Sequence, residues 1–368
     1  MLDIKLIREQ TEQIKTALLK RLDAVDFTEL LAWDDARRSA QADLEAKRTE
    51  RNDVSAKVPA LKKSGADVQP LFAEMKVLGN AIKELEADVA ALEQKIHDFM
   101  ARLPNVPDPD VLGGGKENNR VLRTFGQKPS FPFEPKDHVE LLGSLGMIDY
   151  GRGTKLGGSG FWVYRGDGAR LEWALLSYFV ERHLAAGYEF ILPPHLLLPV
   201  CGYTAGQFPK FAGDVFHLEK QPDQEQRFLL PTAETALVNL HRDEILEEAE
   251  LPRKYFAYTP CYRKEAGSYR TEERGTVRGH QFNKVELFQY CRPQDSSGAL
   301  EQMLEHARSI VEALGLHHQV SQLAAGDASE GMVKTFDIEV WLPSMGQYKE
   351  VSSASNARDY QARRGQIR

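Results

Sequence analysis

The most informative stretch of this chain reads Arg263-Lys264-Glu265, then a polar loop that ends at Arg278, then His280-Gln281-Phe282-Asn283-Lys284-Val285-Glu286. The flanking segments, Tyr255 to Tyr262 and Gln281 to Tyr290, are rich in aromatic and β-branched residues with partial alternation, which is typical of strands. Between them, residues 266–277 are polar and punctuated by glycine. The pattern therefore predicts two strands joined by a loop.

The residue types of this hairpin suit one reaction, the activation of a carboxylate by ATP. Attack on the α-phosphorus builds negative charge on its non-bridging oxygens, and a guanidinium such as that of Arg263 can meet two of these oxygens at once. Arg278 can hold the outer phosphates, Phe282 offers a ring face to a purine, and Glu286 can accept an ammonium. Composition alone also fits a surface hairpin with solvated charges.

The full pattern resembles motif 2 of the class II aminoacyl-tRNA synthetases, and the segment from His280 to Glu286 is similar to the form found in seryl-tRNA synthetases. The resemblance implies that Arg263 and Arg278 are the catalytic arginines, at the α-phosphate and the terminal phosphates of ATP. It also implies an adenine site with Glu265 at one end and Phe282 at the ring face. The implied ATP contacts in this hairpin are Arg263, Lys264, Glu265, Arg278 and Phe282.

The hairpin loop departs from one common version of the family. Residues 270–275 read Arg-Thr-Glu-Glu-Arg-Gly where that version reads Gly-Arg-Asp-Thr-Arg-Gly, at the same length. In the family this loop changes shape between ATP and tRNA acceptor contacts, so the difference bears on the acceptor end rather than on the fold.

Length and composition fit a two-domain soluble protein. The 368 residues are 42% hydrophobic and 27% charged, without an apolar run long enough to span a bilayer and without a signal peptide, so we expect a cytoplasmic protein and no membrane partner. The three cysteines, Cys201, Cys261 and Cys291, are isolated, which favours free thiols and no zinc site. The net charge of -7 restricts any RNA contact to a local surface.

A heptad repeat runs from Leu71 to Leu103, with apolar residues at strictly alternating spacings of four and three. A weaker repeat runs from Leu30 to Leu61, where basic residues interrupt the same register. Because Ser64-Gly65-Ala66-Asp67 separates the two repeats, we expect two helices that fold back antiparallel into an arm roughly 50 Å long.

Basic residues crowd the first helix of this arm, among acids. They fit either a stripe that follows an RNA backbone or the surface of a structural or dimerising coiled coil. The resemblance adds that seryl-tRNA synthetases carry an N-terminal antiparallel coiled-coil arm, here about residues 27–103 of a domain over 1–103, which grips the long variable arm of their tRNA. The implied contacts to tRNA-Ser are Arg37, Arg38, Lys47, Arg48, Arg51 and Lys57.

The rest of the chain predicts a linker and then a catalytic domain. Residues 104–120 are a linker by composition, with three prolines followed by three glycines. Over 121–368 helix and strand patterns mix in the order of an α+β domain built on an antiparallel sheet with flanking helices, which is the class II catalytic fold. The expected elements are helices at 169–186 and 297–314 and strands near 227–230, 255–262, 281–290 and 336–341.

Two further segments extend the resemblance. Gly187 to Pro194 follows a long helix and resembles motif 1, which lies at the dimer interface of class II enzymes and so implies a homodimer. Pro231-Thr232-Ala233-Glu234 by itself favours a helix cap. In the family this Thr-x-Glu lines the amino-acid pocket, where buried polar groups would reject alanine because they would be left unpaired. The implied contacts to L-serine are Thr232, Ala233, Glu234, Arg263 and Glu286.

The segment from Glu350 to Asn356 supplies oxygen ligands. A carboxylate and a hydroxyl three residues apart at a strand end suit a Mg²⁺ ion held mostly by phosphates, although solvated polar residues at a strand end fit equally. The match to the family's Glu-x-Ser-Ser-x-Ser-Asn assigns Glu350, Val351, Ser352 and Ser353 to ATP, with Glu350 and Ser353 at the metal ion. Asp337 and Glu339 are weaker candidates.

The chain is thus identified as a member of the seryl-tRNA synthetases, of bacterial type. The resemblance implies that it forms seryl-adenylate from L-serine and ATP and transfers serine to the 3′ end of tRNA-Ser, and of tRNA-Sec where one exists. In the family, motif 3 follows the segment that ends at Asn356. No such motif occurs between Asn356 and Arg368, so we expect a C-terminally incomplete catalytic domain. That gap supports a second hypothesis, a tRNA-binding or dimerising homologue without competent adenylation, whereas the arm disfavours a homologue that loads a carrier protein.

Overall fold

The computed structural model describes residues 1–265 and 275–368, which form two compact units. The helical unit comprises Asp3–Lys15 and Ala24–Leu103, and the sheet unit comprises Met1–Leu2, Thr16–Asp23 and Pro104–Arg368. The loop in which the sequence departs from its family version, at residues 270–274, lies outside the described residues. In the described part of the chain, no helix combines the length and the apolar character needed to cross a membrane.

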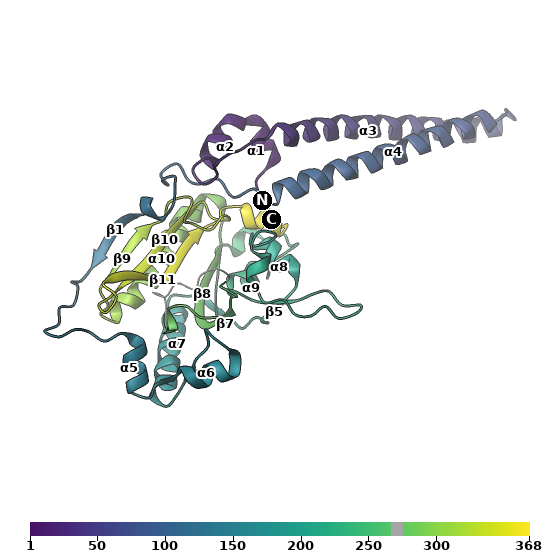
Figure 1. Ribbon diagram of the computed structural model, residues 1–368. Coiled ribbons are helices and arrows are strands. Elements are labelled where there is room, and N and C mark those ends of the chain that lie inside the picture. Colours follow the sequence, from purple (N-terminus) through teal and green to yellow (C-terminus); the bar gives the residue numbers. More distant parts are fainter. Residues whose placement is uncertain (266–274) are drawn as a thin grey trace. The chain divides into compact units, whose positions relative to one another are not determined.

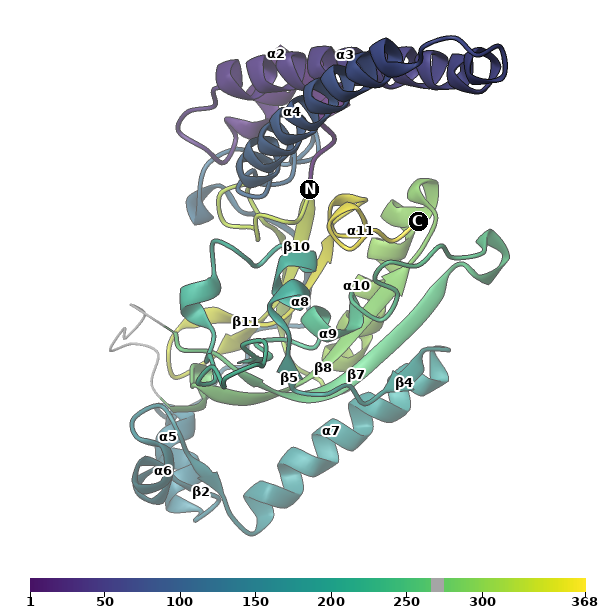
Figure 2. The ribbon, with the colours of Figure 1, turned by 90° about the vertical axis from the view of Figure 1, so that its right-hand side faces the viewer.

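The helical unit contains the predicted arm. After α1 (Ile4–Glu9) and the start of α2 (Thr11–Leu18), the long helices α3 (Thr28–Lys63) and α4 (Gln69–Met100) lie side by side (Figures 1 and 2). The heptad residues of α4 are buried or half-buried, which confirms the predicted seam. Its most buried members along the helix are Leu78, Ile82 and Val89.

One buried charge in α3 was missed by the sequence reasoning. Asp34 is fully buried and accepts charged contacts from Arg8 at 2.6 Å, Arg37 at 2.9 Å and Arg38 at 3.3 Å. Burial opposes ionisation, but the hydrogen bonds from Arg37 and Arg8 outweigh it and lower the pKa of Asp34. This carboxylate therefore ties α1 to α3 and occupies two of the arginines predicted to contact tRNA.

A four-stranded antiparallel sheet forms one part of the sheet unit. Its strand order is β1 (Arg120–Phe125), β9 (His318–Gln322), β10 (Lys334–Leu342) and β11 (Gln347–Asn356). Helix α10 (Ser296–Ala313) covers one face, where Leu300 and Leu304 pack with Phe336 and Ile338 in a buried apolar core (Figure 2). The predicted helix and strand in this region are confirmed.

A second sheet contains the predicted hairpin. Strands β7 (Arg253–Tyr262) and β8 (Gln281–Tyr290) pair antiparallel over their whole length, with Cys261 opposite Phe282. The short strand β4 (Glu189–Ile191), from the segment that resembles motif 1, pairs parallel to β7. The α+β class is confirmed, but in the described residues the expected antiparallel sheet is divided in two and includes this parallel pair.

Apart from α7, the remaining elements are short. Helix α7 corresponds to the helix predicted at 169–186 and packs near β7 and β8. The predicted strand near 227–230 is the short β6, which pairs with β5. These elements are α5 (His138–Ser144), β2 (Ile148–Asp149), α6 (Tyr150–Gly157), β3 (Val163–Tyr164), α7 (Asp167–Ala185), β5 (Leu196–Leu197), α8 (Pro199–Thr204), β6 (Phe228–Leu229), α9 (Glu234–Leu237) and α11 (Tyr360–Arg364).

The segment predicted as a linker over 104–120 is not a free tether at its start. The backbone N–H of Asn105 donates to the carbonyl of Glu330 at 2.7 Å, and Val111 is buried. The ammonium of Lys20 donates to the carbonyls of Asp108, Pro109 and Val111 at 3.2, 2.9 and 2.7 Å. Prolines and glycines correctly indicated the lack of regular structure, but side-chain contacts fix the segment to the sheet unit.

Candidate active site

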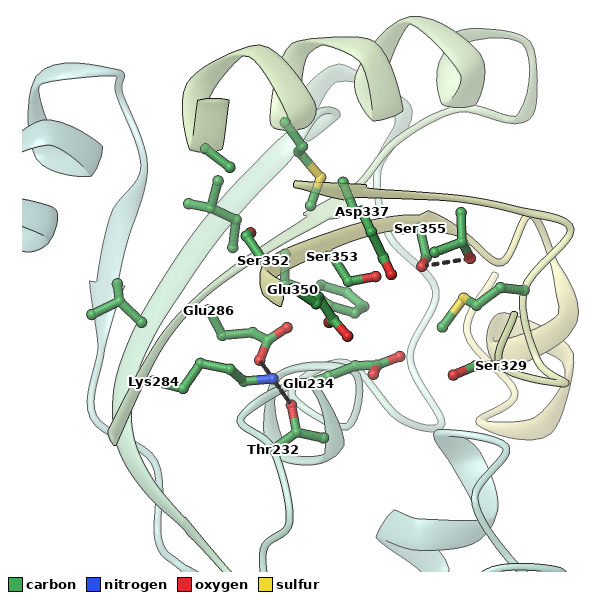
Figure 3. Close-up of a pocket in the computed structure, with 18 of the residues that line it drawn as sticks. Thr232, Glu234, Lys284, Glu286, Ser329, Asp337, Glu350, Ser352, Ser353 and Ser355 are labelled. Atoms are coloured by element: carbon green, nitrogen blue, oxygen red, sulfur yellow. Dashed lines mark hydrogen bonds and ion pairs between the residues drawn. The ribbon is translucent and has the colours of Figure 1, made fainter. Parts of the chain in front are cut away.

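A cavity of about 1970 Å³ lies between β8 and β11, each of which is the edge strand of its own sheet (Figure 3). One wall, here called the β8 wall, consists of β8, the end of β7 and the segment around Thr232. The other, the β11 wall, consists of β10 and β11. The two walls bring together most of the residues that the sequence singled out, although those residues come from segments more than one hundred positions apart.

The β8 wall holds a compact group of three side chains. The hydroxyl of Thr232 donates to Oε2 of Glu286 at 2.8 Å, and the ammonium of Lys284 donates to Oγ1 of Thr232 at 2.7 Å. Lys284 also forms an ion pair with Oε2 of Glu286. Because side chains alternate along a strand, Phe282, Lys284 and Glu286 share the face of β8 that borders the cavity.

Thr232 does not cap the helix that follows it. Helix α9 begins at Glu234, and its N-terminus has no side-chain cap. Ala233 is fully buried in an apolar core with Leu237 and Tyr255, so it supports the pocket from behind rather than lining it. The capping interpretation of this segment is therefore wrong, because the threonine hydroxyl is directed to β8.

Glu234 reaches the cavity from the start of α9 and accepts a hydrogen bond from the side-chain amide of Gln361 at 2.6 Å. Burial raises its pKa to about 7, and the negative charge of Glu286 acts in the same direction. Gln361 and the nearby charges of Lys284 and Arg263 oppose the shift. The wall thus contains two interacting carboxyl groups, of which one has a pKa near neutrality.

Arg263 stands at the end of β7 in a defined position. Its backbone N–H donates to the carbonyl of His280 at 2.9 Å, and its Nε donates to the carbonyl of Pro231 at 3.2 Å. The guanidinium carbon lies 5.1 Å from the ring centre of Phe282. The guanidinium is therefore oriented by a backbone oxygen and an aromatic ring, and among the described residues its terminal nitrogens have no hydrogen-bond or ion-pair partner at the cavity.

Two further charged residues of the hairpin, Arg278 and Glu265, pair with each other. Nη1 of Arg278 lies 2.6 Å from Oε2 of Glu265, and both residues line the cavity. Glu265 has a positive φ of 47°, a conformation that costs energy for a residue other than glycine. Lys264 is anchored through its backbone N–H to the carbonyl of Asp214 at 2.9 Å and does not line the cavity.

The β11 wall contains an irregularity that the sequence did not reveal. Ile338 pairs with Ser352 and Glu339 with Glu350, so Val351 is an extra residue in β11 and forms a bulge. In a regular strand residues three apart face opposite sides, but the bulge places Glu350 and Ser353 on one side. These residues lie inside β11, which ends at Asn356, rather than at a strand end as predicted.

The same register gathers carboxylates on the cavity face. Asp337 is opposite Ser353, and Glu339 is opposite Glu350, so all four share this face. Figure 3 shows Asp337 and Glu350 pointing into the cavity. Burial raises the pKa of Asp337 to about 7, and repulsion by the charge of Glu350 adds to this effect.

The carboxylates of the β11 wall have neutral partners. Glu339 accepts hydrogen bonds from Ser321 at 2.6 Å and Gln319 at 2.9 Å, whereas the buried Oδ1 of Asp337 has no hydrogen-bond partner among the described residues. Over residues 1–265 and 275–368, no three His, Cys, Asp or Glu side chains are arranged to hold a metal ion by themselves. A cation at this wall would need further ligands from a bound molecule.

The predicted tRNA contacts all lie on α3 but differ in their partners. Arg37 and Arg38 contact Asp34, Lys47 lies 2.9 Å from Glu50, and Arg48 lies 2.8 Å from Glu45 and 2.9 Å from Glu86 of α4. Among the described residues, Arg51 and Lys57 form no ion pair. The basic residues nearer the tip of the arm are thus the ones with unneutralised charge.

Sequence reasoning missed two residues of the site. The resemblance assigns no role to Lys284, although its place two residues before Glu286 in a strand puts both on one face. Gln361 could not be found, because its contact with Glu234 joins positions 127 residues apart and no local pattern marks it.

Two family models match the chain. The seryl-tRNA synthetase N-terminal domain matches residues 1–107, and the tRNA synthetase class II core domain (G, H, P, S and T) matches residues 216–368. Serine–tRNA ligase 2 of Clostridium acetobutylicum is 59% identical over an alignment that covers all of this chain and 87% of that relative. The chain belongs to the seryl-tRNA synthetase family.

Other members of the seryl-tRNA synthetase family agree with this assignment. The serine–tRNA ligase of Geobacillus kaustophilus is 44% identical, again over the whole chain and 87% of the relative. The crystal structure of the seryl-tRNA synthetase from Pyrococcus horikoshii complexed with ATP matches with a TM-score of 0.92 at 34% identity, covering 100% of this chain and 87% of that one. The predicted family, the class II fold and the coiled-coil arm are therefore confirmed.

Proposed function

We propose that this chain, as a serine–tRNA ligase, condenses L-serine with ATP to seryl-adenylate and pyrophosphate and then transfers serine to the 3′ end of tRNA-Ser, and of tRNA-Sec where one exists. The observation that carries the proposal is that one cavity combines an ammonium-accepting pair, Thr232 and Glu286, with an oriented guanidinium, that of Arg263. Family membership supports the same reaction. The alternative of a tRNA-binding homologue without adenylation has no support from the relatives.

The amino acid would be held by the β8 wall. Glu286 and Thr232 offer oxygens to the α-ammonium of serine, and Glu234 adds a carboxyl group beside them. Arg263 is then placed to hold the substrate carboxylate near the α-phosphate. In this geometry the reaction needs no covalent enzyme intermediate, because orientation and charge stabilisation suffice.

ATP would lie between the two walls. Arg263 would meet the charge that develops at the α-phosphate, and the ring of Phe282, which now faces that guanidinium, is available to the adenine. Arg278 would have to exchange Glu265 for the terminal phosphates, and its side chain, which is 41% exposed, has room for that movement. Val351 and Ser352 border the same space from β11.

The β11 wall fits a Mg²⁺ ion that enters with ATP. Glu350 and Ser353 are the proposed ligands, with Asp337 beside them, and hard oxygen donors with few protein ligands are typical of Mg²⁺ bound to phosphates. The ion would neutralise charge on the phosphates. The protein contributes the bulge that aligns these oxygens and a buried carboxyl group whose ionisation such an ion would favour.

We also propose a homodimer in the cytoplasm, with the segment that resembles motif 1 at the interface. Four large apolar side chains of these elements are exposed: Leu171 and Trp173 of α7 by 50% and 60%, and Phe190 and Leu192 at β4 by 36% and 72%. Strand β4 is one of the two edge strands of its sheet, at the opposite edge from β8. A second copy would cover these side chains.

The arm would contact the variable arm of tRNA-Ser. Of the predicted contacts, Arg51 and Lys57 are the best placed to neutralise phosphates, because they form no ion pair in the described part of the chain. Arg37, Arg38, Lys47 and Arg48 would first have to leave carboxylates.

Aminoacylation of a tRNA-Ser transcript by the full-length protein tests the proposal. Labelled serine should become acid-precipitable on the tRNA, with one AMP released for each serine transferred. Retention of the tRNA without AMP release would instead support the binding homologue. A wild-type protein that charges the transcript with another amino acid would contradict the proposed substrate.

A further inference from the structure

We propose that Lys284 is a place-holder for the substrate: its ammonium occupies the position between Thr232 and Glu286 that the α-ammonium of serine takes, and serine binds by displacing it. This inference rests on the proposed function and assigns a specificity-determining role to a residue that the sequence reasoning left without one.

The contacts of the Lys284 ammonium define the position. Nζ donates to Oγ1 of Thr232 at 2.7 Å and forms an ion pair with Oε2 of Glu286, while Thr232 itself donates to that same oxygen at 2.8 Å. The two acceptors assigned to the substrate ammonium are therefore already bound to a primary ammonium (Figure 3). Acceptors that bind the ammonium of lysine can also bind the α-ammonium of serine, because both are primary ammonium groups that donate charged hydrogen bonds.

Charge explains why such a place-holder is needed. Glu234 and Glu286 lie in the same wall, and their mutual repulsion together with burial favours protonation of Glu234, whereas Lys284 and Arg263 oppose it. A protonated or reoriented carboxyl group would be a poor acceptor for serine. While no substrate is bound, the Lys284 ammonium offsets the charge of the Glu286 carboxylate through their ion pair.

The same geometry requires displacement. A second ammonium group at hydrogen-bond distance from both Oε2 of Glu286 and Oγ1 of Thr232 would stand close to the Lys284 ammonium, and the repulsion between the two like charges favours the departure of one of them. Lys284 can move, since its side chain is 32% exposed and its four-carbon stem is flexible. A serine analogue without an ammonium gains nothing by displacing it, so the exchange selects for amino acids over hydroxy acids.

A kinetic test distinguishes two roles for Lys284: a place-holder that competes with serine, and a scaffold that only holds Glu286 in position. The KM for serine in ATP–pyrophosphate exchange is measured for the full-length wild type, Lys284→Met, Lys284→Gln and Lys284→Arg. A place-holder competes with serine, so its removal in the Met and Gln variants should lower KM roughly three- to tenfold, as expected for the loss of one partly screened charge-assisted contact. Arginine, whose fork holds Glu286 with two hydrogen bonds, should raise KM by a similar factor.

A scaffold that only holds Glu286 in place would give the opposite pattern, in which Met and Gln raise KM and Arg restores it, and that result would overturn the proposal. Lys254→Met is the matched control, because Lys254 lies on β7, contacts Gln302 and does not line the cavity. It should leave the KM for serine unchanged. Absence of exchange in the wild type would count against the proposed function itself, and the two failures are thus distinct.

A second readout uses methylammonium, a free primary ammonium. In Lys284→Gln it should fill the vacated position and inhibit competitively with serine, at concentrations that do not affect the wild type. Equal sensitivity of the two proteins to methylammonium would contradict a place-holder.

Discussion

The charged side chains of the two cavity walls differ in whether they form ion pairs. On the β8 wall two ion pairs neutralise much of the charge, Lys284 with Glu286 and Arg278 with Glu265. On the β11 wall, Asp337 and Glu350 form no ion pair with any described residue and instead repel each other. The β8 wall can therefore bind charged substrates by exchanging partners, whereas the β11 wall gains most from a cation that arrives with a ligand.

The largest expected effect comes from removing the oriented charge of the β8 wall. In Arg263→Ala, kcat for serine-dependent exchange should fall about 100- to 1000-fold, because one fixed donor to the transition state is lost. Arg253→Ala, at the opposite end of β7 and paired with Glu250, is the control and should remain within about twofold. A similar loss in both variants would show that strand stability rather than the reacting charge is being measured.

The second-largest effect is expected at the β11 wall, where Asp337 and Glu350 form no ion pair with any described residue. Glu350→Gln should reduce exchange by roughly 10- to 100-fold at low Mg²⁺, with partial recovery as Mg²⁺ is raised, because one charged ligand is replaced by a neutral one. The measurement is a Mg²⁺ titration at saturating ATP and serine. A titration curve identical to that of the wild type would remove Glu350 from the metal site.

A third prediction concerns stability and pH. The pKa of Asp337 is about 7 in the folded protein against an ordinary value of 3.8, so the folded state holds a proton that the unfolded chain has lost. The free energy of unfolding should therefore fall as the pH rises from about 4 to about 7. Glu234, whose pKa is also raised to about 7, adds a fall of the same sign.

Asp337→Asn, which stays neutral, should weaken this dependence and stabilise the fold at pH 8 by about 1–2 kcal/mol. Denaturant unfolding of both proteins between pH 4 and pH 8 provides the measurement. Asp223→Asn, at an exposed position with positive φ that asparagine tolerates, is the control. Parallel curves for wild type and Asp337→Asn would mean that Asp337 is ionised throughout.

The smallest effect is expected on the arm, where a lysine without an ion-pair partner among the described residues can be compared with one that has such a partner. Lys57→Gln should raise the KM for tRNA-Ser by a few-fold and reduce the salt dependence of tRNA binding by about one ion, without changing serine-dependent exchange. Lys47→Gln, which loses a lysine already paired with Glu50, should have less effect on tRNA. The opposite ranking of the two variants would refute the assignment of the contacts to the tip of the arm.

Much of the architecture follows from local patterns. The heptad spacing predicted α4, and the aromatic and β-branched run predicted β8 with its observed bounds of Gln281–Tyr290. These patterns predict the elements correctly because burial repeats within a single element, every 3.5 residues in a coiled-coil helix and every 2 residues in a strand. The resemblance to the family motifs, each of which is one continuous stretch of sequence, singled out Arg263, Arg278, Glu286 and Glu350, and all four line the cavity.

Contacts between distant segments could not be predicted in this way. The bulge at Val351 changes which residues share a face, yet nothing in the local sequence marks it. Thr232 looked like a helix cap because its bond to Glu286 spans 54 positions. Asp34 could not be singled out, because its partner Arg8 belongs to another helix. In each case a tertiary contact outweighed the local preference.

The dependence of ATP–pyrophosphate exchange on the amino acid supplied tests the central claim most directly. With the full-length protein, ATP and Mg²⁺, L-serine should support exchange, and L-alanine, which lacks the hydroxyl group, should be about 1000-fold or more less effective because polar groups of the pocket would be left unpaired. Exchange that is absent with serine, or equal with alanine, would contradict serine activation between the β8 and β11 walls.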